Sequence, residues 1–304
     1  MSDAAAVLDD LRNESDELDL LVAELTAGQW AGPTPAERWT VAHQIAHLTW
    51  TDEVALLAVT DPDAFAAEVA KAQAAPDSFV DQAAEELVAE EPAALLARWR
   101  DGRDRLQRAL RTAPPGTRIP WYGPPMSVAS MATARLMETW AHGQDVADAL
   151  GAVRAPTARL RHIARIGVRA RDYAFLVRGI KTPGEEFRVE LGSPDGEVIA
   201  FGPEGAAQRV TGPLHDFCLL VTQRAHRDDL AVRAEGADAD QWLDIAQAFA
   251  GPPGPGRAPG GRAPGSGAPG GGAPGGGAPG GGAPGGGAPG GGAPGGGAPG
   301  GGAR

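Results

Sequence analysis

The sequence predicts a mixed fold: an N-terminal four-helix bundle, a small C-terminal α+β domain and a disordered tail rich in Gly, Pro and Ala. Three observations support it. Long amphipathic helical patterns fill the first half, and short alternating apolar patterns follow Pro156. From Gly251 onward the chain is almost wholly Gly, Pro and Ala. We expect the corresponding domains at residues 1–152, 153–250 and 251–304.

Four long helices are expected in the first half, because apolar residues recur there at spacings of three and four. Thr40 and Ser127 are the expected N-caps of the second and fourth, and Gly151 ends the fourth. Shorter helical pieces lie between Pro62 and Glu91. The long helices are predicted at residues 3–26, 40–61, 92–112 and 127–150.

The second half combines helices with short strands. Alternating apolar residues predict strands at residues 187–191, 198–201, 208–211 and 230–235, with a turn at Ser193–Gly196 between the first two. Helices are expected at residues 157–178, from Pro213 onward, and at 238–249. We interpret the arginines between Arg154 and Arg178 as a solvated helix face, and His162 among them as a surface residue.

The tail repeats Ala-Pro-Gly-Gly-Gly seven times from Ala268. Side chains no larger than alanine or proline cannot offset the entropy lost on folding, so this segment is predicted to be an extended linker. The repeat has a period of five, which excludes a collagen helix. No chemistry is assigned to it.

Charge and composition exclude several classes of protein. The 304 residues carry a net charge of −12, and the tail contributes three arginines and no acid, so the remainder is more acidic still. Such a surface argues against nucleic acid or an anionic membrane as partner. No apolar run approaches the roughly 18 residues of a membrane span, and no signal peptide is readable. We therefore expect a cytoplasmic protein.

One group of residues has the pattern of a metal site. Glu138 and His142 are four residues apart, on one face of the fourth helix, and His47 lies on the second helix. Two imidazoles and a carboxylate with a vacant position are typical of catalytic zinc or another divalent ion. His43 is a fourth ligand or a supporting group, and Asp145 could orient a ligand imidazole. The alternative is a surface Glu–His pair and core histidines.

At these residues the sequence resembles a known family. The motifs Trp39-Thr-Val-x-x-x-x-Ala-His47-Leu and Arg135-Leu-x-Glu138-x-x-x-His142-x-x-Asp145 look like the DinB-like, metal-binding N-terminal domain of the mycothiol-dependent maleylpyruvate isomerase family. The second half, including Arg209-Val-Thr-Gly-Pro213 and Phe217-Cys-Leu-Leu-Val-Thr-Gln-Arg224, is similar to the small C-terminal domain of that family. The resemblance covers roughly residues 5 to 250.

The resemblance implies a metal-dependent enzyme. His47, Glu138 and His142 would bind a divalent metal, zinc in the first place, and mycothiol would be activated there as a thiolate. In the isomerase the thiolate adds to a conjugated double bond, the bond rotates and the thiol leaves; relatives transfer the thiol to electrophiles. Arg224 matches the basic residue that assists the acid groups of the substrate. Abundant Arg, Ala and Gly with few Lys suggest an actinobacterial source.

Other readings stay open. A protein with this fold could be a non-catalytic metal-binding or ligand-binding module, and His43 as a fourth ligand would favour that reading. A regulatory partner of a transcription factor, with the tail as spacer, is a third reading. Cys218, the one cysteine, lies in an apolar helix and is interpreted as a buried structural thiol.

Overall fold

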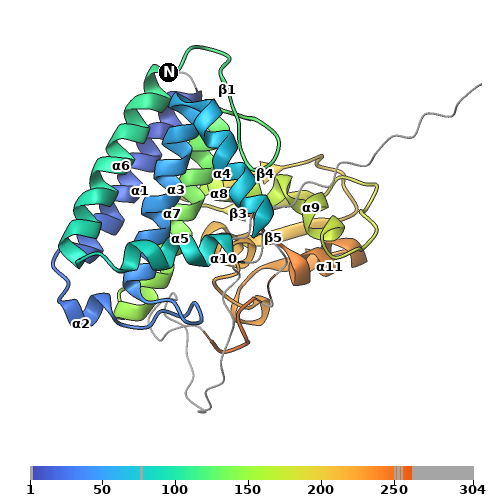
Figure 1. Ribbon diagram of the computed structural model, residues 1–304. Coiled ribbons are helices and arrows are strands. Elements are labelled where there is room, and N and C mark those ends of the chain that lie inside the picture. The colour runs from blue at the N-terminus through green and yellow to red at the C-terminus, as the bar shows by residue number, and fades with distance from the viewer. Residues whose placement is uncertain (1–2, 76–77, 250, 252–253, 255, 262–304) are drawn as a thin grey trace, which may run out of the picture.

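The computed structural model describes residues 3–75, 78–249, 251, 254 and 256–261. The predicted fold class is confirmed: long helices form one half and a small sheet with short helices forms the other (Figure 1). Most of the predicted tail, residues 262–304, lies outside the described residues. The bundle helices are α1 (Asp3–Val22), α3 (Val41–Thr60), α6 (Pro92–Thr112) and α7 (Val128–Leu150).

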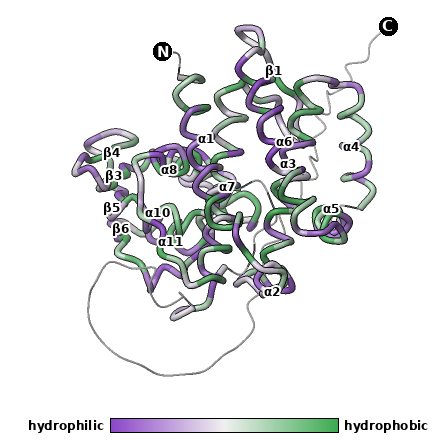
Figure 2. The backbone as a smooth tube through the Cα atoms, turned by 90° about the vertical axis from the view of Figure 1, so that its left-hand side faces the viewer, coloured by the Kyte–Doolittle hydropathy of each residue, from purple (hydrophilic) through white to green (hydrophobic). Residues whose placement is uncertain are grey.

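Helix α3 lies at the centre of the bundle. It packs against α6 and α7, and α1 packs along α7. Most residues of α3 are buried because its sequence is apolar on nearly every side. Hydrophilic and hydrophobic residues alternate along the outer helices, as expected of amphipathic segments (Figure 2). A helix buried on all sides can present polar side chains to the interior, and α3 carries His47 there.

The three predicted caps Thr40, Ser127 and Gly151 are observed, whereas α1 ends at Val22 and not at residue 26. The backbone N–H of Thr40 donates to Nδ1 of His43 (3.2 Å), and Oγ of Ser127 accepts from the N–H of Ser130 (3.1 Å). Gly151 ends α7 with a φ of 66°, a left-handed conformation that glycine adopts without strain. These caps fix where α3 and α7 begin, and therefore which of their residues face each other.

Smaller elements connect the bundle helices. Helix α2 (Ala27–Trp30) follows α1, whereas α4 (Pro62–Ala74) and α5 (Phe79–Val88) lie between α3 and α6. A two-stranded pairing of β1 (Arg118–Ile119) and β2 (Met126–Ser127) closes the proline-rich loop before α7, at the end of the bundle opposite α2 (Figures 1 and 2). The sequence pattern missed this pairing because strands of two residues show no alternation.

The second half contains a four-stranded sheet in the order β4-β3-β5-β6. The predicted hairpin of β3 (Arg188–Gly192) and β4 (Val198–Phe201) is antiparallel, β5 (Arg209–Pro213) pairs parallel to β3, and β6 (Arg233–Glu235) lies antiparallel to β5. The other elements are α8 (Leu160–Arg169), α9 (Arg171–Leu176), α10 (Leu214–Val221), the 3-10 helix η1 (Arg227–Asp229) and α11 (Ala237–Ile245). The boundary between residues 152 and 153 stays a prediction.

Two predicted helices in this half are shorter than expected. The single helix at residues 157–178 is wrong, because the chain bends at Ala170 between α8 and α9, and beyond the bend Phe175 is buried. The last helix ends at Ile245 rather than at Phe249, because the backbone of the next residue, Ala246, is extended. Helix α8 lies close to α10: a Cβ on Gly167 would come within 2.9 Å of Val221, so only glycine permits this packing.

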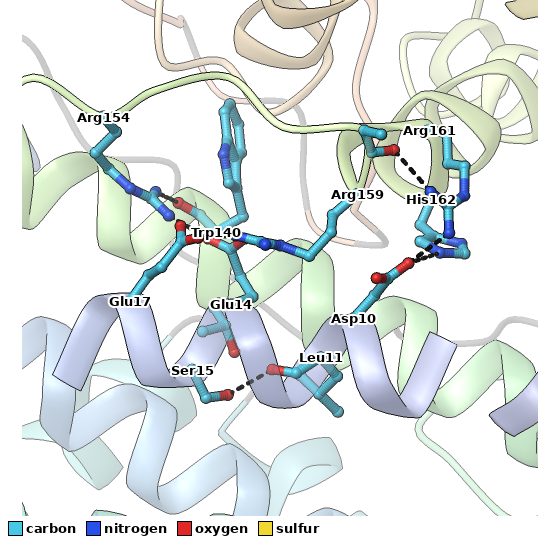
Figure 3. Close-up of polar contacts among 12 residues, drawn as sticks. Asp10, Leu11, Glu14, Ser15, Glu17, Trp140, Arg154, Arg159, Arg161 and His162 are labelled. Atoms are coloured by element: carbon cyan, nitrogen blue, oxygen red, sulfur yellow. Dashed lines mark hydrogen bonds and ion pairs between the residues drawn. The ribbon is translucent and has the colours of Figure 1, made fainter. Parts of the chain in front are cut away.

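The arginines after α7 tie the two halves together, and the prediction of a solvated face is wrong for several of them. Arg154 and Arg159 both pair with Glu14 of α1, and Arg159 also pairs with Glu17 (Figure 3). His162 contacts Asp10 at 2.8 Å with a largely buried side chain, so it is not a surface residue. The spacing of the arginines gives no sign of these partners, because the acidic residues of α1 lie 140 or more positions earlier in the chain.

Among the described residues, no helix combines the length and the apolar character that crossing a membrane requires.

Candidate metal centre

Three side chains from two bundle helices converge in the interior. His47 of α3 and Glu138 and His142 of α7 each offer a ligand atom, and these atoms lie within 4.8 Å of one another. Oε2 of Glu138 is 3.4 Å from Nε2 of His47 and 3.2 Å from Nε2 of His142. Two ligands at about 2.05 Å from a tetrahedral zinc ion lie about 3.3 Å apart. The separations and the donor set therefore fit a tetrahedral divalent ion.

The protonation states also suit a cation. Burial and the neighbouring His47 lower the pKa of His142 to about 4, so this imidazole is neutral at pH 7 and has a free lone pair. Burial acts to raise the pKa of Glu138, but its close contacts with His142 and His47 and the charge of Arg135 hold it well below its ordinary value. An ionised carboxylate next to a neutral imidazole is the state that binds a metal.

Gln44 orients His142. The Nδ1 atom of His142 lies 2.5 Å from Oε1 of Gln44, whose amide nitrogen donates to Oγ1 of Thr34 at 2.9 Å. Since the amide oxygen only accepts, Nδ1 carries the proton and Nε2 is left as the ligand atom. The expectation that Asp145 orients an imidazole is wrong, because its carboxylate pairs with Arg224 and Arg257 instead. No sequence motif marked Gln44, although its position one turn before His47 could have.

His43 faces away from the three ligand atoms. Its Nδ1 contacts Thr40 (Oγ1 at 2.8 Å) and its Nε2 lies 3.3 Å from Glu85 of α5. Both ring nitrogens are therefore engaged at the start of α3. The structure gives no support to His43 as a fourth ligand.

Aromatic rings enclose the site. Trp39 stacks on His142 at a centroid distance of 5.9 Å and contacts His47 at 5.4 Å, and Trp50 lies 5.9 Å from His47. The Trp39 indole donates to Asp81 of α5 (3.3 Å), which fixes its orientation. Trp140 instead contacts His215, away from the ligands. Trp39 and Trp50 thus limit the access of water to the ligands.

Cavities lie on two sides of the three ligands. A large one, of about 990 Å³, is lined mainly by apolar side chains and also by Arg135, and it reaches His47 and Glu138. A small one, of about 50 Å³, contains all three ligands together with Trp39, Arg224 and Arg257. His47 and Glu138 border both, so a metal ion at this point would be reachable from either side.

The second half supplies two arginines to the small cavity. Arg224, expected from the sequence, donates from Nη2 to Asp145 of α7 at 2.8 Å. Arg257 was missed because it belongs to the glycine- and proline-rich segment, where composition argued against any defined contact. Its side chain is only 16% exposed. Cys218 lies elsewhere and is fully buried, and burial raises its pKa well above the ordinary value, as expected of a structural thiol.

Two family models match the chain. Residues 11–147 match the mycothiol maleylpyruvate isomerase N-terminal domain, which spans the bundle and includes His47, Glu138 and His142. Residues 183–235 match a model described as wyosine base formation, which spans strands β3 to β6.

Similar proteins include two from Mycobacterium tuberculosis, in strains CDC 1551 / Oshkosh and ATCC 25618 / H37Rv, both described as uncharacterised. Each is 60% identical over 257 residues, which is 84% of this chain and 100% of the relative. Among solved structures, a mycothiol-dependent maleylpyruvate isomerase and a histidine-to-alanine mutant of it share the fold. Each aligns with a TM-score of 0.51 and 17% identity over 76% of this chain and 92% of the other.

Proposed function

Since the chain belongs to the mycothiol maleylpyruvate isomerase family, we propose that it is a metal-dependent enzyme acting with a low-molecular-weight thiol of the mycothiol type. His47, Glu138 and His142 hold a divalent ion, zinc in the first place. The reaction is the isomerisation of a small electrophile or the transfer of the thiol to it. The observation that carries the proposal is the convergence of three ligand atoms, two of them from side chains that line both cavities.

The metal supplies one chemical property: a thiol bound to a divalent cation loses its proton near neutral pH. Glu138 brings the negative charge that attracts the cation, and the neutral His142 presents Nε2 because Gln44 holds its Nδ1 proton. Trp39 and Trp50 limit the access of water to the ligands. Each of these contributions belongs to a side chain whose position the bundle fixes.

The two cavities suit two reactants of different size. A volume of about 990 Å³ is at the upper end of what small-molecule sites provide, and is large enough for a thiol carrying sugar groups. We assign the thiol to this cavity. Arg224, in the small cavity, is the residue we assign to the electrophile. The mycobacterial relatives support an actinobacterial source, and we propose mycothiol as the thiol on that basis. We also propose that the protein acts in the cytoplasm.

Metal content, measured by elemental analysis, tests the site. The wild-type protein should hold about one divalent ion per chain, and His47→Ala and Glu138→Ala should lose it while the far-ultraviolet circular dichroism stays unchanged. His43→Ala is the matched control, because His43 lies one turn earlier on α3 and faces Thr40 and Glu85. A protein that takes up no metal even after incubation with zinc would contradict the proposal.

Thiol binding separates an enzyme from a non-catalytic module. With Co²⁺ in place of zinc, mycothiol should produce a thiolate-to-cobalt absorption band in wild-type protein, because the protein provides three ligands and a fourth position is open. A metal-loaded protein whose cobalt spectrum mycothiol and smaller thiols leave unchanged would favour the metal-binding module. The engagement of both His43 ring nitrogens favours the open position.

A further inference from the structure

Arg257 reaches into the small cavity from a segment beyond the last helix. Its Nη2 donates to Oδ1 of Asp145 at 2.5 Å. Three residues later, the N–H of Gly260 donates to both carboxylate oxygens of Asp229, at 3.0 and 2.8 Å. One contact lies on α7 and the other at η1, so the segment around Arg257 is anchored to both halves of the protein.

Asp145 is shared between two arginines. Its Oδ2 accepts from Nη2 of Arg224 (2.8 Å) and its Oδ1 from Arg257, and the carboxylate is 1% exposed. One negative charge thus holds two guanidinium groups side by side. Among the described residues, the buried Nε of Arg224 has no hydrogen-bond partner. The pair therefore keeps a donor and a positive charge that Asp145 does not satisfy.

The surrounding groups leave this excess charge in place. Burial lowers the pKa of Arg257, and the charge of Arg224 acts in the same direction, although Asp145 and Asp148 act to raise it. Asp148 lies one turn beyond Asp145, and its carboxylate also accepts from Gln144 at 2.8 Å. Burial is the largest of these causes, and a guanidinium group that has been removed from water is stabilised by a further anion.

The small cavity favours a compact anion. Its volume is about 50 Å³, and Arg224 and Arg257 line it together with the three ligands. A carboxylate is planar and matches the fork of a guanidinium, whereas a tetrahedral phosphate is larger. A ligand held there would lie next to His47 and Glu138, which line both cavities.

We propose that Arg257 and Arg224 together form a subsite for a carboxylate end of the electrophilic substrate, and that Arg257 is a specificity-determining residue. Asp145 holds the two guanidinium groups at a fixed separation. This inference rests on the proposed function, because it takes the bound carboxylate to be part of the substrate. The arginine pair is held by Asp145 rather than by the metal ligands, although the charge of Arg224 acts on His142.

The test is the affinity for maleate, a small dicarboxylate, measured by isothermal titration calorimetry on the full chain. Arg257→Gln should weaken binding about 10- to 100-fold, as expected when a charged hydrogen bond is lost. Arg257→Lys keeps the positive charge, so its affinity for maleate should lie between those of wild type and Arg257→Gln. Arg105→Gln is the matched control, because Arg105 is exposed and pairs with the exposed Asp101 one turn away. The maleate affinity of this variant should equal that of wild type. The neutral diamide, maleamide, should bind weakly and without regard to Arg257.

Equal maleate affinity in wild type and Arg257→Gln, or no binding to wild type at millimolar maleate, would overturn the inference. If Arg257→Gln unfolds more readily, Arg257→Lys decides, because the lysine keeps a contact to Asp145. Repeating the titration on the metal-free Glu138→Gln variant separates the two proposals. If wild-type protein takes up no metal but binds maleate in an Arg257-dependent way, the proposed function alone is refuted. Metal uptake with Arg257-independent binding would refute the inference alone.

Discussion

Two glutamates lie in polar clusters inside this protein, and their partners differ in kind. Glu14 of α1, 1% exposed, pairs with Arg154 and Arg159, two permanent cations that join the halves (Figure 3). Glu138 of α7 contacts the imidazoles of His47 and His142, and His142 is neutral at pH 7. The first carboxylate is neutralised by the protein, and the second is only partly so.

This difference separates a structural cluster from a candidate binding site. A buried charge must be compensated, because desolvation costs several kcal/mol per ion. Around Glu14 the compensation is complete, and Arg154 makes a further bond to the carbonyl of Trp140 (3.0 Å). Glu138 contacts two imidazoles instead, and Arg135 acts on it through its charge. A cluster that leaves a carboxylate and neutral imidazoles facing one point is suited to a cation from solution.

The largest effect is expected at Glu14. Glu14→Gln leaves Arg154 and Arg159 without their shared buried anion, so we expect the free energy of unfolding to fall by about 3 to 5 kcal/mol, measured by urea unfolding. Asp9→Asn is the control: Asp9 is more than half exposed and pairs with Arg111, so the loss of this surface ion pair should cost less than about 1 kcal/mol. The metal content of Glu14→Gln should stay at the wild-type level. A loss of metal with unchanged stability would reverse the roles we assign to the two glutamates.

A third buried acid, Asp52, lies between these extremes. It is 5% exposed, and the nearest guanidinium atom of Arg135 is 3.9 Å away. Burial raises its pKa to about 6, although Arg135 and Arg103 act to lower it. The folded state therefore holds this proton more tightly than the unfolded chain. The resulting stability is fully present below a pH of about 3.8 and is lost as the pH rises through 6.

The difference in unfolding free energy between wild type and Asp52→Asn should consequently shift with pH. When the pH falls from about 7.5 to about 4.5, this difference should change by about 2 kcal/mol in favour of wild type. The change does not depend on how much stability the substitution removes at a pH of about 7.5. Urea unfolding at the two pH values measures it. A difference that is constant, or that moves the other way, would mean that Asp52 is compensated as fully as Glu14.

Gln44 tests whether the orientation of His142 matters for the metal. Gln44→Leu removes the acceptor of the Nδ1 proton, so we expect metal affinity to fall about 10- to 100-fold, measured by competition with a chromophoric chelator. Gln107→Leu is the matched control, since Gln107 is also buried and donates to the carbonyl of Leu8 (2.8 Å) far from the ligands. That variant should lose stability but keep its metal affinity. If Gln44→Leu binds metal as tightly as Gln107→Leu, the Gln44 side chain contributes packing but does not orient His142 for the metal.

The sequence predicted the bundle helices because they depend on short-range spacing. A four-residue separation puts Glu138 and His142 on one helix face, and the caps Thr40 and Ser127 fix where the two helices begin. The hairpin of β3 and β4 followed from the turn between two alternating segments. Local spacing did not decide that His47, 91 residues before Glu138, faces this pair; that expectation rested on the resemblance to the family.

What the sequence could not predict depends on partners far away along the chain. The arginines after α7 were interpreted as solvated because nothing local marks Glu14 as their partner. Asp145 has the right spacing to support His142, yet two arginines 79 and 112 residues later claim its carboxylate. Arg257 stands in a segment whose composition argues against structure. Long-range charge pairing overrides local spacing in all three cases.

The smallest effect concerns His43, which has the residue type of a ligand without the position of one. His43→Ala removes the acceptor of the Thr40 N–H at the start of α3, so we expect the free energy of unfolding to fall by about 1 kcal/mol. Its contact with Glu85 adds little, because that carboxylate is 70% exposed. Metal content should equal that of wild type, whereas His47→Ala should contain none. A His43→Ala protein that loses its metal would instead make His43 the fourth ligand, and the open position needed for a thiol would no longer exist.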